Sequence, residues 1–109
     1  VGLDNQSSKD DRMLALNKTS DFYSMVIAHD PNLFDEIEYY KHNLQFSGHT
    51  HAGQIKLFNY TPIMHTSKDK MHGLWKKNFM IGYTSSGLGS SSYPIRFNTN
   101  NEMTIFTFS

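Results

Sequence analysis

The stretch FYSMVIAHDPNLFDEIEYYKHNLQFSGHTHAGQ, from Phe22 to Gln54, contains the pattern that decides the fold. Phe22 to Ala28 is an apolar run without helix caps, which is typical of a strand covered on both faces. Asp30 then predicts a helix N-cap, with Pro31 in the first turn where its missing N–H costs nothing. Leu44 to Phe46 indicates a second short strand. A strand, a helix and a strand in this order predict two parallel strands joined by a right-handed crossover.

The segment between the two expected strands has the spacing of an amphipathic helix. Four apolar residues fall on one helical face: Leu33, Phe34, Ile37 and Tyr40. Acidic residues lie toward its start, and Lys41 and His42 lie at its end, which complements the helix dipole. Asn43 is expected to stop the helix. Because open α/β sheets bind ligands at the carboxyl ends of their strands, the residues after each strand are candidates for a functional site.

Histidines follow both expected strands. His29 ends the first strand, and His49 and His51 lie one residue apart in a turn flanked by Gly48 and Gly53. In a looped backbone, two residues at this spacing can converge on one site. Neutral imidazole is the commonest metal ligand, and glycine lets the backbone approach a bound ion closely. The pattern predicts that the three histidines form a metal site at one end of the sheet.

Three segments carry a resemblance to a known family. Ser47 to Gln54, SGHTHAGQ, resembles the last metal motif of the calcineurin-like metallophosphoesterases, in the form found in a bacterial membrane- or envelope-associated phosphodiesterase subfamily. Val26 to Pro31, VIAHDP, resembles the preceding histidine motif. Tyr83 to Gly89, YTSSGLG, with Pro94 to Asn98, PIRFN, resembles the closing segment of that subfamily. The resemblance therefore covers most of the chain.

The family's earlier motifs, Asp-x-His, Gly-Asp and Gly-Asn-His, do not occur in these 109 residues. We therefore expect residues 1–109 to be the C-terminal portion of a metallophosphoesterase domain, whose N-terminal half belongs to a longer parent protein. The resemblance implies an α/β (α+β) fold class. In that family the fold is a four-layer αββα sandwich with mixed β-sheets and flanking helices, and this chain would form one half of it.

The resemblance also implies a dinuclear metal site. In that site His29 and His49 bind the second ion and His51 binds the first, with the ions about 3.5–4 Å apart. Two divalent ions, Mn, Fe or Zn, would belong to the full-length protein, and one or none to this chain alone. Their bound water would attack a phosphodiester or phosphomonoester substrate. No catalytic side chain is assigned beyond the metal ligands.

Two other interpretations fit the same residues. One is a non-enzymatic module in which the histidines hold a single structural zinc ion, and the other is an interaction domain without metal.

A cupin-type His-x-His strand calls for a glutamate a few residues further on, and Ala52 to Lys56 supplies none. Asp30 is better explained as a helix cap than as a ligand. His65 and His72 are expected to be surface residues of a long loop.

The composition excludes several classes of function. Ten basic and ten acidic side chains give a net charge of zero, so no electrostatic footprint for nucleic acid is evident. The absence of cysteine excludes disulfides and thiolate metal sites. No apolar run approaches the length of a transmembrane helix. Localisation stays open between membrane or envelope association of the parent protein and the cytoplasm.

The rest of the chain yields a coarser set of expected elements. They are a strand end at Gly2 to Asn5, a helix from Arg12 to Lys18 with Met13, Leu14 and Leu16 inward, a strand at Ile55 to Phe58, a long loop from Asn59 to Asn78, a strand at Phe79 to Thr84, and a hairpin pairing Tyr93 to Asn98 with Met103 to Phe108. Half of a sandwich leaves apolar sheet surface and strand edges uncovered, so we expect this chain to self-associate.

Overall fold

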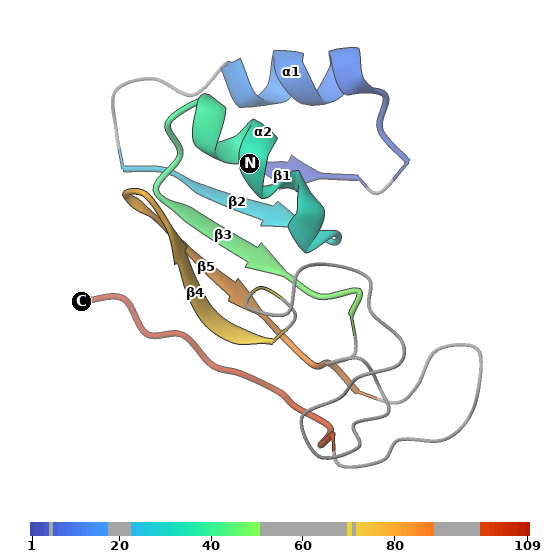
Figure 1. Ribbon diagram of the computed structural model, residues 1–109, viewed down its shortest axis with the longest axis vertical. Helices are drawn as coiled ribbons and strands as arrows, with labels where there is room; N and C mark the ends of the chain where they lie inside the picture. The colour runs from blue at the N-terminus through green and yellow to red at the C-terminus, as the bar shows by residue number, and fades with distance from the viewer. Residues whose placement is uncertain (5, 18–22, 51–69, 71, 89–98) are drawn as a thin grey trace.

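The computed structural model describes residues 1–4, 6–17, 23–50, 70, 72–88 and 99–109. In this part of the chain, a mixed five-stranded sheet with the order β1-β2-β3-β5-β4 forms the centre of the molecule (Figure 1). Its strands are β1 Gly2–Leu3, β2 Met25–Ala28, β3 Leu44–Ser47, β4 Gly73–Lys77 and β5 Met80–Thr84. β1, β2, β3 and β5 are parallel, and β4 is antiparallel to β5. The expected α/β class with a mixed sheet is confirmed.

Helices lie beside the first three strands (Figure 1). α1 spans Lys9–Asn17 and begins one turn earlier than expected, while the 3-10 turn η1, Pro31–Leu33, leads directly into α2, Phe34–Tyr39. The side chain of Asp30 accepts a hydrogen bond from the N–H of Asn32 at 2.9 Å, which confirms the predicted cap. No helix in the described ranges is long and apolar enough to cross a membrane.

The strand–helix–strand unit has the predicted parallel arrangement, with Met25 of β2 paired to Leu44 of β3. The predicted apolar face of its helix is also confirmed. Ile37 is fully buried, and three partly buried residues pack beside it: Leu33, Phe34 and Tyr40. This face positions the helix on the sheet, so that the ends of β2 and β3 are held in register.

The end of α2 differs from the expectation. α2 ends at Tyr39, four residues before Asn43, and Lys41 directly after the Tyr40 C-cap adopts a left-handed backbone conformation with φ 62°. Asn43 instead accepts a hydrogen bond on its Oδ1 from the N–H of Ser24 at 2.9 Å. The predicted helix stop at Asn43 is therefore wrong, because its side chain tethers the start of β2 to the start of β3.

α1 faces the core through fewer residues than expected. Leu16 is 1% exposed, but Leu14 is 60% exposed and Met13 is also exposed, so the inward placement of these two residues is wrong. The reason lies in Arg12, one helical turn before Leu16 and on the same face. Its guanidinium forms two bonds to Glu36 of α2, at 2.8 and 3.1 Å, and this ion pair fixes the rotation of α1.

β2 is covered on one face only. Val26 and Ala28 point toward the helices and are buried, whereas Met25 and Ile27 are exposed on the opposite face, Ile27 to 60%. The expected burial of this strand on both faces is wrong because the apolar faces of both described helices lie on the same side of the sheet. The sheet therefore has a helix-covered face and an open face.

A second strand pair extends the sheet beyond β3. Gly73–Lys77, the end of the expected long loop, is strand β4, so the loop was predicted too long. Trp75 is buried, and its indole N–H donates to the hydroxyl of Thr84 at 2.9 Å. Its ring lies on Gly82, where an added Cβ would sit 2.1 Å from a ring carbon. Phe34 of α2 meets the Trp75 ring with 6.1 Å between centroids.

Residues 99–109, here called the C-terminal segment, run along the open face of the sheet (Figure 1). Residues 103–108 form no strand in the described part of the chain, and their expected hairpin partner, 93–98, lies outside it, so the hairpin stays a prediction. The segment packs through aromatic side chains, with the Phe106 and Phe46 ring centroids 4.5 Å apart.

Candidate metal centre

The carboxyl ends of three parallel strands meet at one edge of the sheet. Beyond β2 and β3, the N–H of Gly48 donates to the carbonyl of His29 at 3.1 Å. The N–H of Ser85, just after β5, donates to the carbonyl of Ser47, the last residue of β3, at 2.8 Å. These bonds continue the parallel pairing into the loops, at the edge where open α/β sheets bind ligands.

Two of the three predicted metal ligands lie in contact at this edge. The Nε2 atom of His29 is 3.1 Å from the Nδ1 atom of His49, and the ring centroids are 4.9 Å apart with an interplanar angle of 68°. His29 is exposed and His49 is half-buried, and the contact is a hydrogen bond between the two rings, whose donor depends on the tautomer. His51 lies outside the described residues, and its predicted role stays a prediction.

The backbone of the turn places the His49 ring beside His29. His49 adopts a left-handed conformation with φ 66°, which is uncommon for a residue with a side chain and occurs most often where surrounding contacts enforce it. Those contacts are the Gly48 bond to His29 and the bond from the Thr50 N–H to the Gly48 carbonyl at 2.7 Å, with Thr50 fully buried. Histidine tolerates this conformation better than most residues.

The two nitrogens have the spacing of neighbouring ligands on one metal ion. Nitrogens each about 2.0–2.1 Å from a zinc-sized ion, at angles from about 90° to 109°, lie about 2.9–3.4 Å apart. The observed 3.1 Å between His29 Nε2 and His49 Nδ1 falls within that range. The described residues contain no group of three metal-ligating side chains. The residues present therefore fit part of a histidine-containing metal site.

The remaining histidines of the described chain have other roles. His42 was expected to complement the dipole of α2, but it is fully buried, with Nδ1 3.0 Å from the hydroxyl of Ser24 and Nε2 3.1 Å from the carbonyl of Leu16. Burial lowers its pKa, which favours the neutral ring inside the protein. His72 is half-exposed, near the surface as expected, while His65 lies outside the described residues.

A further polar centre near this edge was not predicted. The carboxylate of Glu102 reaches back to the loop after β5, where the N–H of Ser86 donates to it at 3.1 Å. Glu102 lies between the two expected strands of the hairpin, and nothing in the sequence near it indicates a distant partner. The one available signal was the alternation of polar and apolar side chains from Glu102 onward. In an extended chain this alternation places Thr104 on the same side as Glu102.

Comparison with curated proteins identifies similar chains in two bacteria. An uncharacterized metallophosphoesterase of Bacillus subtilis, YkuE, is 36% identical over 111 residues, which cover 93% of this chain and 39% of the relative. Proteins from two strains of Helicobacter pylori, also named uncharacterized metallophosphoesterases, are 36% identical over 76 residues, covering 68% of this chain and 20% of each relative. No family model matches the chain, and no solved structure matches it significantly.

These relatives support the metallophosphoesterase resemblance at the level of the superfamily. The chain spans about two fifths of the Bacillus relative and one fifth of the Helicobacter relatives. The similarity therefore concerns one part of longer proteins, and none of the printed names specifies a metal, a substrate or the phosphodiesterase subfamily.

Proposed function

We propose that this chain is the C-terminal portion of a metal-dependent phosphoesterase whose dinuclear site takes ligands from His29, His49 and His51. The observation that carries the proposal is the 3.1 Å separation of His29 Nε2 and His49 Nδ1 at the ends of two neighbouring parallel strands. Both residues lie in motifs that resemble metal motifs of that family. The names of the three relatives support the same class of enzyme.

The role of the chain is to hold imidazole nitrogens in place. When bound, divalent ions such as Mn, Fe or Zn would supply a nucleophilic water and neutralise charge on the phosphoryl oxygens. His29 and His49 would hold the second ion through neutral rings that each offer a lone pair, and His51 would contribute to the first. The bond between Gly48 and His29 preserves the spacing of the two strand ends. Oxygen ligands would come from the rest of the parent protein.

The substrate of the parent protein would be a phosphodiester or a phosphomonoester. The net charge of zero gives this chain no broad basic field, so substrate recognition would depend on the metal ions and on local groups. We further propose that the parent protein belongs to a bacterial phosphodiesterase subfamily associated with the membrane or envelope. This assignment rests on the Gly53-Gln54 extension of the histidine motif.

The test uses the longer parent protein with bis-p-nitrophenyl phosphate as the substrate. His29→Ala and His49→Asn should each lower kcat/KM by at least about 100-fold, since even partners of metal ligands contribute about 10–100-fold. Asparagine is chosen at position 49 because it accepts the left-handed backbone of the turn. His72→Ala, which removes a half-exposed histidine outside the site, should retain wild-type kcat/KM.

Metal analysis of the same proteins separates the alternatives. Two ions per parent chain, reduced in the His29 and His49 variants, support the enzyme. One tightly held zinc ion without hydrolysis supports the alternative, a non-enzymatic module with a structural zinc. The 109-residue chain alone should be inactive, because three histidines divided between two ions fall short of the three protein ligands that catalytic sites generally need. Unchanged turnover in both variants would contradict the proposal.

A further inference from the structure

The carboxylate of Glu102 connects three separate parts of the chain. It contacts the imidazole of His72 before β4, the phenol of Tyr83 on β5, both the N–H and the hydroxyl of Ser86, and the hydroxyl of Thr104. The His72 Nε2 atom lies 2.7 Å from the carboxylate, and the Ser86 hydroxyl lies 2.9 Å from it. We call Glu102 and these four partners the Glu102 network. The Glu102 side chain is only 20% exposed, so the hydrogen bonds of the network replace most of the hydration of its carboxylate.

The C-terminal segment depends on this network for its polar attachment. The N–H of Glu102 donates to the carbonyl of Gly87 at 2.8 Å, and the residues after it form no strand in the described part of the chain. Beyond Glu102 and Thr104, the segment holds to the sheet through Phe106, whose ring centroid lies 5.0 Å from that of Tyr83 and 4.5 Å from that of Phe46. Polar and aromatic contacts therefore converge on Tyr83.

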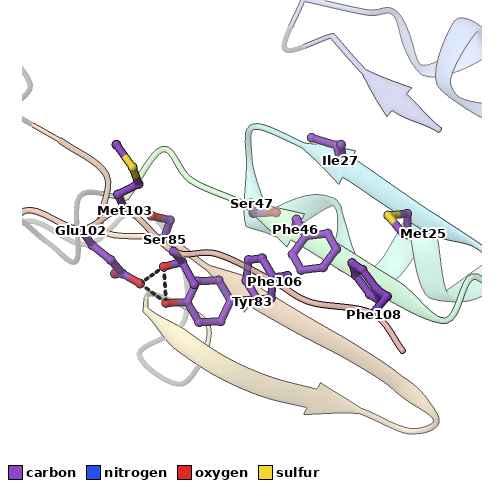
Figure 2. Close-up of a pocket in the computed structure, with 11 residues that line it drawn as sticks. Met25, Ile27, Phe46, Ser47, Tyr83, Ser85, Glu102, Met103, Phe106 and Phe108 are labelled. Atoms are coloured by element: carbon purple, nitrogen blue, oxygen red, sulfur yellow. Dashed lines mark hydrogen bonds between the residues drawn. The ribbon is translucent and has the colours of Figure 1, made fainter.

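The segment forms one wall of a cavity on the open face. This cavity has a volume of about 330 Å³, and its apolar floor includes Ile27 and Phe46 of the sheet. Figure 2 shows Glu102 at one end of the cavity, bonded to Tyr83, and the rings of Phe106 and Phe108 along the sheet. The attachment of the segment therefore determines how much of this apolar floor is covered.

We propose that the ionised carboxylate of Glu102 fastens the C-terminal segment across the open face of the sheet, and that protonation of this carboxylate releases it. An ionised carboxylate accepts hydrogen bonds at about four lone-pair positions, and such charge-assisted bonds are about twice as strong as neutral ones. A protonated acid donates one bond and loses acceptor capacity. The donors of Tyr83, Ser86 and Thr104 then lose their shared partner. The bonds from the Glu102 N–H to the Gly87 carbonyl and from the Ser86 hydroxyl to the Asn100 carbonyl still hold the start of the segment, so the residues after Thr104 are those released, with only their rings left in contact with the sheet.

The direction of the pH dependence follows from the surroundings of the carboxylate. Burial raises the pKa of Glu102, but hydrogen bonds from Thr104, Ser86 and His72, with the charge of His72, lower the pKa more, so it lies below its ordinary value. Within the described residues, the titratable groups in contact with the carboxylate are His72 before β4 and Tyr83 on β5. The attachment is fully present above the ordinary glutamate pKa and is lost as pH falls through the lowered value.

The test is nuclear magnetic resonance of the isotope-labelled 109-residue chain as a function of pH. The side-chain carbon of Glu102 and the amides of Phe106 and Phe108 should titrate with one shared midpoint, below the ordinary glutamate value of about 4.3. The amide of Val26 in the buried core should stay unchanged through that transition. Loss of the Val26 signal at the same midpoint would show that acid unfolds the whole domain, and would overturn the proposal.

A matched pair of variants completes the test at neutral pH. Glu102→Gln should move the Phe106 and Phe108 amides to their acid positions, whereas Glu38→Gln, which removes the same charge from α2, should leave them unchanged. If Glu102→Gln fails to fold, Tyr83→Phe and Thr104→Val each remove one donor and should move the amides part of the way. Amides that keep their wild-type positions in these variants would overturn the proposal.

Discussion

The two faces of the sheet are built from alternate residues of the same strands, yet they are covered in different ways. On the helix-covered face, Val26 and Ala28 of β2 and Met80 of β5 are buried under α1, α2 and the Trp75 ring. On the open face, Met25, Ile27 and Ile81 are exposed beside the C-terminal segment. The alternation of side chains along a strand decides which residues share a face of the sheet. Which of the two faces is buried depends on where the helices pack.

The two faces of the sheet are also held by different contacts. The covered face is closed by a continuous apolar core that includes Ile37 and Trp75, and by the ion pair between Arg12 and Glu36. On the open face, the C-terminal segment is held by the Glu102 network and by the contacts of Phe106 with Phe46 of β3 and Tyr83 of β5. We infer that the covered face supplies most of the stability of this chain.

The largest expected difference is between two isoleucines. Ile37→Ala, at a fully buried position, should lower the free energy of unfolding by about 2–5 kcal/mol, because it leaves a cavity in the core. Ile27→Ala, at a position 60% exposed, should change it by about 0.5 kcal/mol or less. Urea unfolding followed by Trp75 fluorescence measures both. Equal losses would remove the distinction between the faces.

A second change sharpens the description of the covered face. Gly82→Ala would place a Cβ 2.1 Å from the Trp75 ring, so the ring must shift and the free energy of unfolding should fall by about 1–3 kcal/mol. Gly2→Ala is the matched control, since an added Cβ there meets no atom within 4 Å. A Gly82→Ala protein as stable as the wild type would show that Trp75 does not close this face.

The third expected effect concerns the open face and self-association. If copies pair through this face, Ile27→Glu should raise the dissociation constant of the dimer at least about tenfold, which corresponds to about 1.4 kcal/mol. Leu14→Glu is the control, because Leu14 is also 60% exposed but lies on α1. Sedimentation equilibrium measures the two constants. A wild-type chain that stays monomeric at high concentration would contradict self-association.

Local patterns in the sequence predicted the central unit well. The apolar spacing around Ile37 and the Asp30-Pro31 pair predicted the helix between β2 and β3, because caps and helical periodicity are local signals. Parallel pairing then predicted that His29 and His49 lie together, as they do at 3.1 Å. Their role as metal ligands, and that of His51, stay predictions.

Contacts between distant residues could not be predicted from the same patterns. The position of the Trp75 ring on Gly82 depends on the pairing of β4 with β5, and sequence spacing gave no sign of it. The burial of His42 between Ser24 and Leu16 likewise depends on tertiary packing. The exposure of Ile27 was missed for a related reason, since an apolar run predicts a strand but not how many of its faces are covered.

The strand order has a consequence for how the chain folds. β4 and β5 are joined by a tight turn at Asn78, with φ 52°, so this hairpin closes a short loop and can form early. β3 and β5 are parallel neighbours separated by a long stretch of chain, so their pairing requires a much larger loop closure. β2 and β3 are separated only by the segment that forms η1 and α2, so their pairing requires a smaller loop closure. We therefore expect the pairing of β3 with β5, which joins the hairpin to the strand–helix–strand unit, to be the slowest step in forming the sheet.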